Sequence, residues 1–364
     1  MNEEISEIGV AVVGFGLAGR VFHAPFVSAV PGLRLEAIVQ RRGDEAAQAY
    51  PTIRIFRSFE QALDDAAVQL IVVATPNETH FDLARQAIKA GKHVVIDKPF
   101  AATSEQAREL CQAARERGVV LAPFHNRRWD GDFLTVRRLI ETNAVGRLVT
   151  LESHFDRFRP IPRANTWKEG ADPANGLLFD LGPHLIDQAL ALFGLPTGIT
   201  ASVRKDRDGT QIEDAFDVTL DYPRLRVHCR STMVACDAAP RFLLHGIQGS
   251  FKKFGVDPQE PALVGGAKVP RLGETTGPVW LEEPEKDWGT LTVAPHPADP
   301  AHLTRTQIKT EAGDYRLFYA NVRDAVRGTG QLAVKPEDGY RVIKLLEMAR
   351  LSSKEQRTLA VNLS

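Results

Sequence analysis

Short apolar runs alternate with amphipathic segments in the first third of the chain. Residues 9–16 (GVAVVGFG) form one such run that ends in glycines, and a helical pattern follows until Pro31 and Gly32 interrupt it. This alternation predicts βαβ units and a parallel sheet, because each short apolar strand is followed by a helix that covers it. The remaining strands of this sheet are predicted at residues 33–40, 68–75, 92–99 and 119–124.

The pattern changes after residue 125, where longer segments alternate apolar and polar residues with a period of two, as in EDAFDVTLDYP and RLRVHCRSTMV. This alternation predicts a mostly antiparallel sheet with one buried face. Residues 255–300 hold 8 of the 22 prolines and show little periodicity, so we expect an irregular excursion there. Helices are predicted over residues 131–143, from Gly182 and Pro183 onwards, and over 314–327 and 336–352.

Composition and charge exclude several classes of protein. Of the 364 residues, 43% are hydrophobic and 25% charged, which is typical of a globular protein large enough for two domains. A formal net charge of -1 gives no overall field for nucleic acid or for an anionic membrane surface. The start, MNEEISEIG, is acidic where a signal peptide is basic, and three cysteines without a C-x-x-C pair fit a reducing compartment. We therefore expect a cytoplasmic protein with no nucleic-acid or membrane partner.

A glycine loop, GFGLAG (residues 14–19), connects the first predicted strand to the first helix. It matches G-x-G-x-x-G, in which glycines permit a tight turn and close backbone approach, and the helix N-terminus offers N–H groups to a pyrophosphate. A plain βα turn is the alternative, since glycines also serve ordinary turns. The loop predicts a Rossmann-type dinucleotide-binding domain with cofactor contacts from Gly14, Phe15, Gly16, Leu17 and Gly19.

The end of the second predicted strand indicates which dinucleotide is bound. A ribose-binding Asp or Glu is expected about 20 residues after the glycine loop, but that region reads Val39-Gln40-Arg41-Arg42. Arg41 and Arg42 offer charged donors to a 2′-phosphate, which a carboxylate would repel. The sequence therefore favours NADP over NAD, unless these are ordinary solvated arginines.

The next two strand ends place polar residues at the same edge of the predicted sheet. The motif ATPNETH follows one strand, and DKPF follows the other. A lysine at such a strand end would polarise a carbonyl or stabilise an alkoxide, although a strand-end lysine is otherwise an ion-pair or solubility residue. The candidate cofactor contacts at these ends are Thr75, Pro76, Asn77, His80, Asp97 and Lys98.

A candidate proton-transfer pair lies in GLLFDLGPHLIDQALALFG (residues 176–194). Pro183 suits the first turn of a helix, so Asp180 would lie in the entry turn and His184 in the first turn. A neutral histidine is suited to take and return a hydroxyl proton. In the alternative reading, Asp180 only favours the helix dipole and His184 is structural. The sequence shows no Cys or His cluster with metal spacing, so we expect no metal site.

Five motifs, GFGLAG, ATPNETH, AGKHVVIDKPF, HNRRWD and DLGPHLIDQ, occur in this order along essentially the whole chain. In this combination the sequence resembles the glucose-fructose oxidoreductase / inositol dehydrogenase (Gfo/Idh/MocA) family of NAD(P)-dependent oxidoreductases. Within that family it is most similar to the NADP-dependent scyllo-inositol dehydrogenase branch, through GRVFHAPF, FHNRRWDGDFLT, FDRFRP and DLGPHLIDQALALFGLP.

The patterns and the resemblance together predict an α/β fold with two domains. Residues 1–124 are expected to form a Rossmann NADP-binding domain. Residues 125–364 are expected to form an α+β domain for substrate binding and oligomerisation, whose last helix packs back towards the first domain. The resemblance implies that the mostly antiparallel sheet of this second domain has an open face through which a homodimer or homotetramer assembles.

The resemblance also implies the roles of the site residues. It implies that Lys98, Asp180 and His184 form a catalytic trio, that a cis peptide bond precedes Pro99, and that the substrate lies between the domains. The family usually has glutamate where this chain has Asp97, which puts the contact of that side chain with the cofactor or with Lys98 in doubt. Residues expected to bind the substrate are Asn126, Arg157 and Trp167.

The expected function is hydride transfer between the nicotinamide of NADP and a carbon of a polyol or sugar, either inositol-like or a keto-sugar. The protein would be an NAD(P)-dependent dehydrogenase or reductase that acts on CH–OH groups. A non-catalytic regulatory protein of the same fold, which binds the dinucleotide without turnover, is the alternative. The presence of Lys98, Asp180 and His184 together argues against that alternative.

Overall fold

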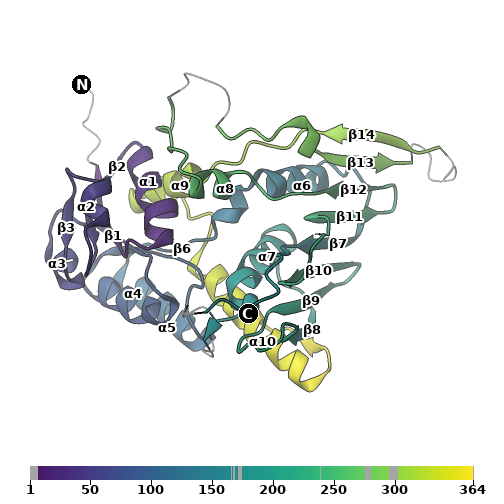
Figure 1. Ribbon diagram of the computed structural model, residues 1–364, viewed down its shortest axis with the longest axis horizontal. Coiled ribbons are helices and arrows are strands. Elements are labelled where there is room, and N and C mark those ends of the chain that lie inside the picture. Colours follow the sequence, from purple (N-terminus) through teal and green to yellow (C-terminus); the bar gives the residue numbers. More distant parts are fainter. Residues whose placement is uncertain are drawn as a thin grey trace. The chain divides into compact units, whose positions relative to one another are not determined.

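The computed structural model (Figure 1) describes residues 7–164, 166, 169–170, 174–237, 239–274, 280–294 and 302–363. The chain forms two compact units. Unit 1 comprises Met1–Asn126, Gln259–Trp280 and Asp314–Ile343, and unit 2 comprises Arg127–Pro258, Leu281–Gly313 and Lys344–Ser364. Within the described ranges, no helix combines the length and the apolar character needed to cross a membrane.

Unit 1 is built on a six-stranded sheet in the order β3-β2-β1-β4-β5-β6, with all neighbours parallel. This order is that of a dinucleotide-binding Rossmann sheet and confirms the predicted parallel sheet. Strands β1 and β4 are buried along their whole length, which explains their continuous apolar sequences. The short, half-exposed strand β3 was not predicted. The strands are β1 (Ile8–Val13), β2 (Leu33–Val39), β3 (Arg54–Phe56), β4 (Leu70–Val73), β5 (His93–Ile96) and β6 (Leu121–Pro123).

Helices cover both faces of this sheet. The strand order runs from β1 to β2 and β3 towards one edge of the sheet, and from β4 to β5 and β6 towards the other edge. Because the crossover connections are right-handed, the helices of the first set and those of the second set lie on opposite faces of the sheet. Figure 1 shows α1 beside α9, and α4 beside α5. The helices of unit 1 are η1 (Gly19–His23, a π-helix), α1 (Ala24–Ala29), α2 (Glu45–Ala49), α3 (Phe59–Asp64), η2 (Asn77–Thr79), α4 (His80–Lys89), α5 (Ser104–Arg117), α8 (Gln259–Val264) and α9 (Arg316–Val326), and α10 (Pro336–Glu355) belongs to both units.

Late segments of the chain complete the core of unit 1. The buried ring of Phe26 packs on Trp280 and Tyr315, with ring centroids 6.1 and 6.0 Å apart. The Arg323 guanidinium donates to the Pro31 carbonyl oxygen at 2.7 Å. These contacts join residues that lie more than 200 positions apart, so no local sequence pattern indicates them.

Unit 2 contains a nine-stranded sheet in the order β14-β13-β12-β11-β7-β10-β9-β8-β15. Only β7 and β10 pair in parallel, so the prediction of a mostly antiparallel sheet is confirmed. The predicted irregular excursion over residues 255–300 is partly wrong, because it contains α8 and β13. The strands are β7 (Leu148–His154), β8 (Gly198–Arg204), β9 (Ala215–Tyr222), β10 (Leu225–Thr232), β11 (Phe242–Gly246), β12 (Gly249–Lys253), β13 (Gly289–Val293), β14 (Thr304–Ile308) and β15 (Leu359–Ala360), and the short helix η5 spans Glu285–Asp287.

The two faces of this sheet differ in chemistry. Buried side chains alternate with half-exposed ones along β9 and β10, and the buried face packs on α7 (Leu177–Phe193). In Figure 1, α6 (Gly131–Glu141) and α7 lie on the same side of the sheet. Residues on the other face form charged pairs across strands, such as Arg230 with Asp217 at 3.1 Å and Arg226 with Asp221 at 3.1 Å. The expected assembly through this face stays a prediction.

Helix α7 begins earlier than the sequence indicated. Its first residue is Leu177, after Gly176 at φ 95°, so Pro183 lies inside the helix rather than at its start. Asp180 is therefore in the first turn, and His184 comes one turn later. The added turn buries Leu177, Leu178 and Phe179, each worth about 1.5–3 kcal/mol, which together outweigh the ~3 kcal/mol cost of an internal proline.

A buried polar network holds α7 in unit 2. The Arg128 guanidinium, in η3 (Asn126–Trp129), donates to both carboxylate oxygens of Asp187 on α7, at 2.8 and 2.6 Å. The Gln188 amide donates to the Arg127 carbonyl oxygen at 2.8 Å and accepts from the buried Arg241 guanidinium at 2.8 Å. The HNRRWD motif therefore fixes the helix that carries Asp180 and His184.

Replacing Arg128 tests this network. In Arg128→Met the buried Asp187 carboxylate loses its bidentate partner, so we expect the free energy of unfolding to fall by about 3–5 kcal/mol. Urea denaturation followed by circular dichroism measures this change. Arg137→Met on α6 is the matched control, because Arg137 and its partner Glu141 are 49% and 66% exposed, and its cost should stay below about 1 kcal/mol. Equal, small losses in both variants would contradict the role of Arg128.

Candidate active site

Parallel pairing places three sequence motifs side by side at one edge of the unit 1 sheet. Val13 at the end of β1 pairs with Val73 on β4, and Val73 pairs with Ile96 at the end of β5. The glycine loop and the ATPNETH and DKPF motifs directly follow these strand ends. Carboxyl ends of parallel strands form the usual ligand-binding edge of such a sheet.

The three glycines of the loop meet different surroundings. Gly14 has φ +99°, and a Cβ atom there would lie 2.5 Å from the Ala74 carbonyl oxygen. At Gly19, a Cβ atom would lie 2.0 Å from the Gly14 carbonyl oxygen. At Gly16, by contrast, a Cβ atom would meet nothing within 4 Å. Gly14 and Gly19 are therefore required by the packing of the loop, whereas Gly16 leaves open space beside the backbone.

This open space fits a pyrophosphate. The backbone at Gly16 is exposed, and the helical segment that begins after it leads into η1. A side chain at Gly16 would fill the space that a pyrophosphate needs to approach the backbone N–H groups. The neighbouring Leu17 is 53% exposed, and the ring of Phe15 packs edge-on against Tyr50 at 6.0 Å.

The loop after β2 is held by Arg57, which the sequence analysis missed. Its guanidinium donates to the carbonyl oxygens of Gln40 and Gly43 at 3.1 and 2.6 Å, and to the Asp44 carboxylate at 2.8 Å. Arg41 and Arg42 lie between these anchor points and are exposed. An ordered loop that presents two arginines to solvent is suited to bind a phosphate. No signal marked Arg57, because it follows the unpredicted strand β3.

The segment after β4 is closed by hydrogen bonds. The Thr79 hydroxyl lies 2.6 Å from that of Thr75 and 2.7 Å from the Pro76 carbonyl oxygen. Thr75 and Asn77 are half-buried, and Pro76 is exposed. His80, the first residue of α4, is only 1% exposed, and its two ring nitrogens lie 2.9 Å from the Pro99 carbonyl oxygen and 2.8 Å from that of Thr75.

Asp97 and Lys98 follow β5, and the peptide bond between Lys98 and Pro99 is cis, as the resemblance implied. Asp97 Oδ1 accepts a hydrogen bond from the Lys98 backbone N–H at 2.7 Å. Burial by itself raises the pKa of Asp97, but His23, Lys98 and His80 together hold this pKa below its ordinary value. Asp97 is thus a carboxylate that shapes the backbone of Lys98, while the Lys98 side chain remains half-exposed.

Two buried residues that the sequence analysis did not select support Asp97. His23 Nε2 lies 3.6 Å from Asp97 Oδ2, and His23 Nδ1 lies 2.6 Å from the Tyr319 hydroxyl. Burial and the Asp97 carboxylate raise the pKa of Tyr319 well above its ordinary value, so its hydroxyl stays protonated. The motif GRVFHAPF contained His23, but Tyr319 comes from α9, and no sequence signal joined the two.

Unit 2 contains the predicted proton-transfer pair. Asp180 accepts a hydrogen bond from the Arg157 guanidinium at 2.8 Å. His184 is 5% exposed and lies four residues after Asp180 on α7, hence on the same face of the helix. The structure thus brings together Asp180 and Arg157, which were predicted separately as a catalytic and a substrate-binding residue. Asn126 is buried at the start of η3, and Trp167 lies outside the described residues.

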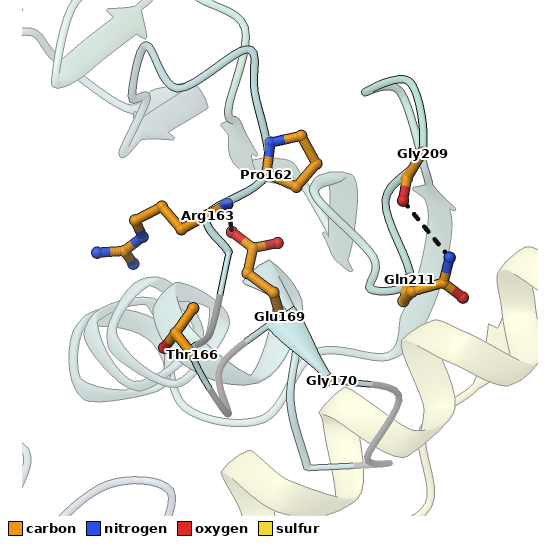
Figure 2. A pocket seen from close by; sticks show the side chains of 7 residues that line it. All are labelled: Pro162, Arg163, Thr166, Glu169, Gly170, Gly209 and Gln211. Carbon is orange, nitrogen blue, oxygen red and sulfur yellow. Dashed lines mark hydrogen bonds between the residues drawn. The ribbon is translucent and has the colours of Figure 1, made fainter.

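An open pocket of about 500 Å³ also lies in unit 2, and none of the predicted site residues lines it (Figure 2). Glu169 accepts from the Arg163 backbone N–H at 3.3 Å and from the buried Arg207 guanidinium at 2.8 Å. Burial raises the pKa of Glu169, but these contacts outweigh it and lower the pKa. The Glu169 carboxylate of this pocket is therefore engaged in structural contacts. Its lining residues are Pro162, Arg163, Thr166, Glu169, Gly170, Gly209 and Gln211.

Among the described residues, no group of three His, Cys, Asp or Glu side chains is arranged to hold a metal ion. The unit 1 sheet edge instead carries a glycine loop and a strand-end lysine, and α7 carries an acid and a histidine.

Comparisons with known proteins identify relatives that match nearly the whole chain. The chain is 39% identical over 362 residues to the uncharacterized oxidoreductase YdgJ of Escherichia coli (strain K12), covering 97% of this chain and 99% of that protein. It is 35% identical over 363 residues to scyllo-inositol 2-dehydrogenase (NADP(+)) IolW of Bacillus subtilis (strain 168), covering 98% and 97%. The solved structure of the oxidoreductase yvaA from Bacillus subtilis has a TM-score of 0.92 and 34% identity, covering 99% of this chain and 100% of that one.

Two family models match successive parts of the chain. The model described as "Oxidoreductase family, NAD-binding Rossmann fold" matches residues 8–125, and the model described as "Oxidoreductase family, C-terminal alpha/beta domain" matches residues 137–363. Together they leave only short segments unmatched. The chain therefore belongs to the Gfo/Idh/MocA family of oxidoreductases.

Proposed function

We propose that this oxidoreductase transfers a hydride between NADP and a ring carbon of a polyol or sugar, either an inositol or a keto-sugar. The observation that carries the proposal is the position of Lys98. It follows β5, whose register with β4 and β1 places it at the same sheet edge as the glycine loop. A cation at that edge is suited to stabilise negative charge on a substrate oxygen beside a bound dinucleotide.

The choice of NADP rests on the loop after β2. Gln40, Arg41 and Arg42 stand where a ribose-binding carboxylate would favour NAD, and Arg57 orders this loop. The relative IolW, whose printed name specifies NADP(+), shares 35% of its residues with this chain. Gly16 and its neighbours would hold the pyrophosphate, and Thr75, Pro76 and Asn77 would line the cofactor on the adjacent strand end.

The proposed chemistry assigns one role to each polar residue. When bound, the nicotinamide supplies or accepts the hydride. In the oxidation direction, His184 takes the proton of the substrate hydroxyl, and Lys98 stabilises the substrate oxygen as its charge grows. Asp180 orients the imidazole of His184 and is itself held by Arg157. In the reduction direction, His184 returns the proton.

The direct test is turnover. The change in NADPH absorbance, measured with a panel of inositols, inososes and keto-sugars, should show activity with at least one cyclic polyol or its ketone. Tight binding of NADPH without turnover on the whole panel would favour a non-catalytic dinucleotide-binding protein instead.

The glycine loop generates a prediction that separates cofactor binding from folding. Gly16→Ala should weaken NADPH binding by tenfold or more, about 1.4 kcal/mol, without lowering the melting temperature, because its Cβ atom meets only open space. Gly19→Ala places a Cβ atom against the Gly14 carbonyl oxygen, so it should lower stability by about 1–3 kcal/mol. Isothermal titration and thermal unfolding of both variants provide the comparison. Normal NADPH affinity in Gly16→Ala would contradict the pyrophosphate assignment.

Cofactor selectivity should depend on Arg41. Arg41→Ala removes a charged donor to the 2′-phosphate, so NADP binding should weaken by about 1.5–3 kcal/mol while NAD binding changes little. Dissociation constants for both dinucleotides measure this difference. Arg108→Ala, which removes an exposed arginine from α5, is the control and should leave both constants unchanged. An equal loss of affinity for NADP and NAD in Arg41→Ala would rule out the 2′-phosphate contact.

Two substitutions test the catalytic residues. Lys98→Met should lower kcat by about two to three orders of magnitude, as expected for the loss of an oxyanion donor, with little change in NADPH affinity. His184→Ala should lower kcat by about 10²- to 10⁴-fold and alter the pH dependence of the remaining activity.

The variant that combines Lys98→Met with His184→Ala provides a further test. The two reductions in kcat should not be additive, because both residues act on the same hydroxyl group of the substrate. Turnover, NADPH affinity and melting temperature should be measured on the same preparations. Near-normal turnover per folded molecule in either single variant would remove that residue from the catalytic assignment.

A further inference from the structure

The buried histidine His80 contacts two backbone carbonyl groups at the proposed cofactor edge. Its Nε2 atom lies 2.8 Å from the Thr75 carbonyl oxygen, which follows β4. Its Nδ1 atom lies 2.9 Å from the Pro99 carbonyl oxygen, which follows β5 and Lys98. One ring therefore bridges the two strand ends from the first turn of α4, and it is 1% exposed.

Both partners of this ring are acceptors. A backbone carbonyl oxygen cannot donate a hydrogen bond, whereas a neutral imidazole has one N–H donor and one lone-pair acceptor. In either neutral tautomer, one nitrogen lone pair would therefore face a carbonyl oxygen at 2.8 or 2.9 Å, away from water. Only the doubly protonated ring donates to both oxygens.

We propose that His80 is an imidazolium in the folded protein and that it acts as a positioning residue, which holds the carbonyl groups of Thr75 and Pro99 and thereby fixes the backbone that follows β4 and the backbone that follows Lys98. This inference rests on the proposed function, because it takes Lys98 as the catalytic cation and Thr75 as part of the cofactor site. The ring acts through the backbone, since both of its nitrogens are already engaged.

The charges around the ring support this assignment. The Asp97 carboxylate interacts electrostatically with His23, Lys98 and His80, which together hold its pKa below the ordinary value. The position at the N-terminus of α4 opposes a cation, but a dipole effect of this kind is weaker than a buried hydrogen bond to a charged donor.

His93, at the start of β5, must instead be neutral and therefore provides an internal reference for the protonation state of His80. Its Nδ1 atom accepts a hydrogen bond from the Val120 backbone N–H at 2.9 Å, so this nitrogen must be unprotonated. Burial also lowers the pKa of His93. The same unit thus contains one histidine that must be neutral and one that must be charged.

The protonation state can be observed directly in the full-length protein. Two-bond ¹H–¹⁵N correlation spectra of ¹⁵N-histidine-labelled protein at neutral pH distinguish the two nitrogens of a neutral ring, which differ widely in shift, from those of an imidazolium, which are nearly equal. Signals that disappear in His80→Gln and His93→Gln identify the two rings. We expect the imidazolium pattern for His80 and the neutral pattern for His93. A neutral pattern for His80 would overturn the proposal.

Kinetics test the positioning role. His80→Gln should lower kcat by about 10- to 100-fold per folded molecule, the effect of a misplaced catalytic group, with a much smaller change in KM. His93→Gln, in which the amide oxygen can still accept from Val120, should keep kcat. Unchanged kcat in His80→Gln would show that the ring is only structural. The spectra need neither cofactor nor substrate, so an inactive wild-type protein would refute the proposed function and leave the state of His80 to be decided separately.

Discussion

The pairing of β1, β4 and β5 in one parallel register is the constraint on which the candidate site in unit 1 depends. Val13, Val73 and Ile96 lie in one row across the sheet, so whatever follows them in the sequence emerges at one edge. A shift of one residue in either pair would turn the side chains of that strand to the opposite face. Local motifs that are dozens of residues apart in the chain thus become neighbours through backbone hydrogen bonds alone. Side chains then fix the loops at this edge. Arg57 holds the loop after β2, and His80 bridges the ends of β4 and β5.

Unit 2 positions its candidate residues by different means. Asp180 and His184 lie on a long helix, α7, that is anchored by buried charged and amide side chains rather than by a sheet edge. Arg128 and Asp187 pair at one side of the helix, and Gln188 links it to Arg241. Such buried polar groups stabilise a fold only when all partners are present. The orientation of α7 is consequently specific, because a rotation of the helix would leave charges without partners.

The sequence predicted those features that are encoded locally. Continuous apolar runs marked β1 and β4, the period of two marked β9 and β10, and the glycine loop marked the first turn. Features that depend on distant residues were missed. The strand β3 has only three residues and a half-exposed pattern, and α7 begins before Pro183 because burial of its first turn outweighs the proline. His23 meets Tyr319 only through the fold, and Arg57 acts on a loop that its own sequence neighbourhood does not reveal.

The return of the chain to unit 1 has a consequence for its biosynthesis. Phe26 is covered by Trp280 and Tyr315, and Phe124 packs against Phe318 with ring centroids 4.8 Å apart. These covering residues are synthesised long after the glycine loop and all six strands have left the ribosome. The nascent N-terminal sheet must therefore wait with part of its aromatic core exposed until α9 emerges. A fragment that ends after β6 would expose this aromatic surface permanently. Unit 1 can therefore complete its core only after the later segments of the chain have been synthesised.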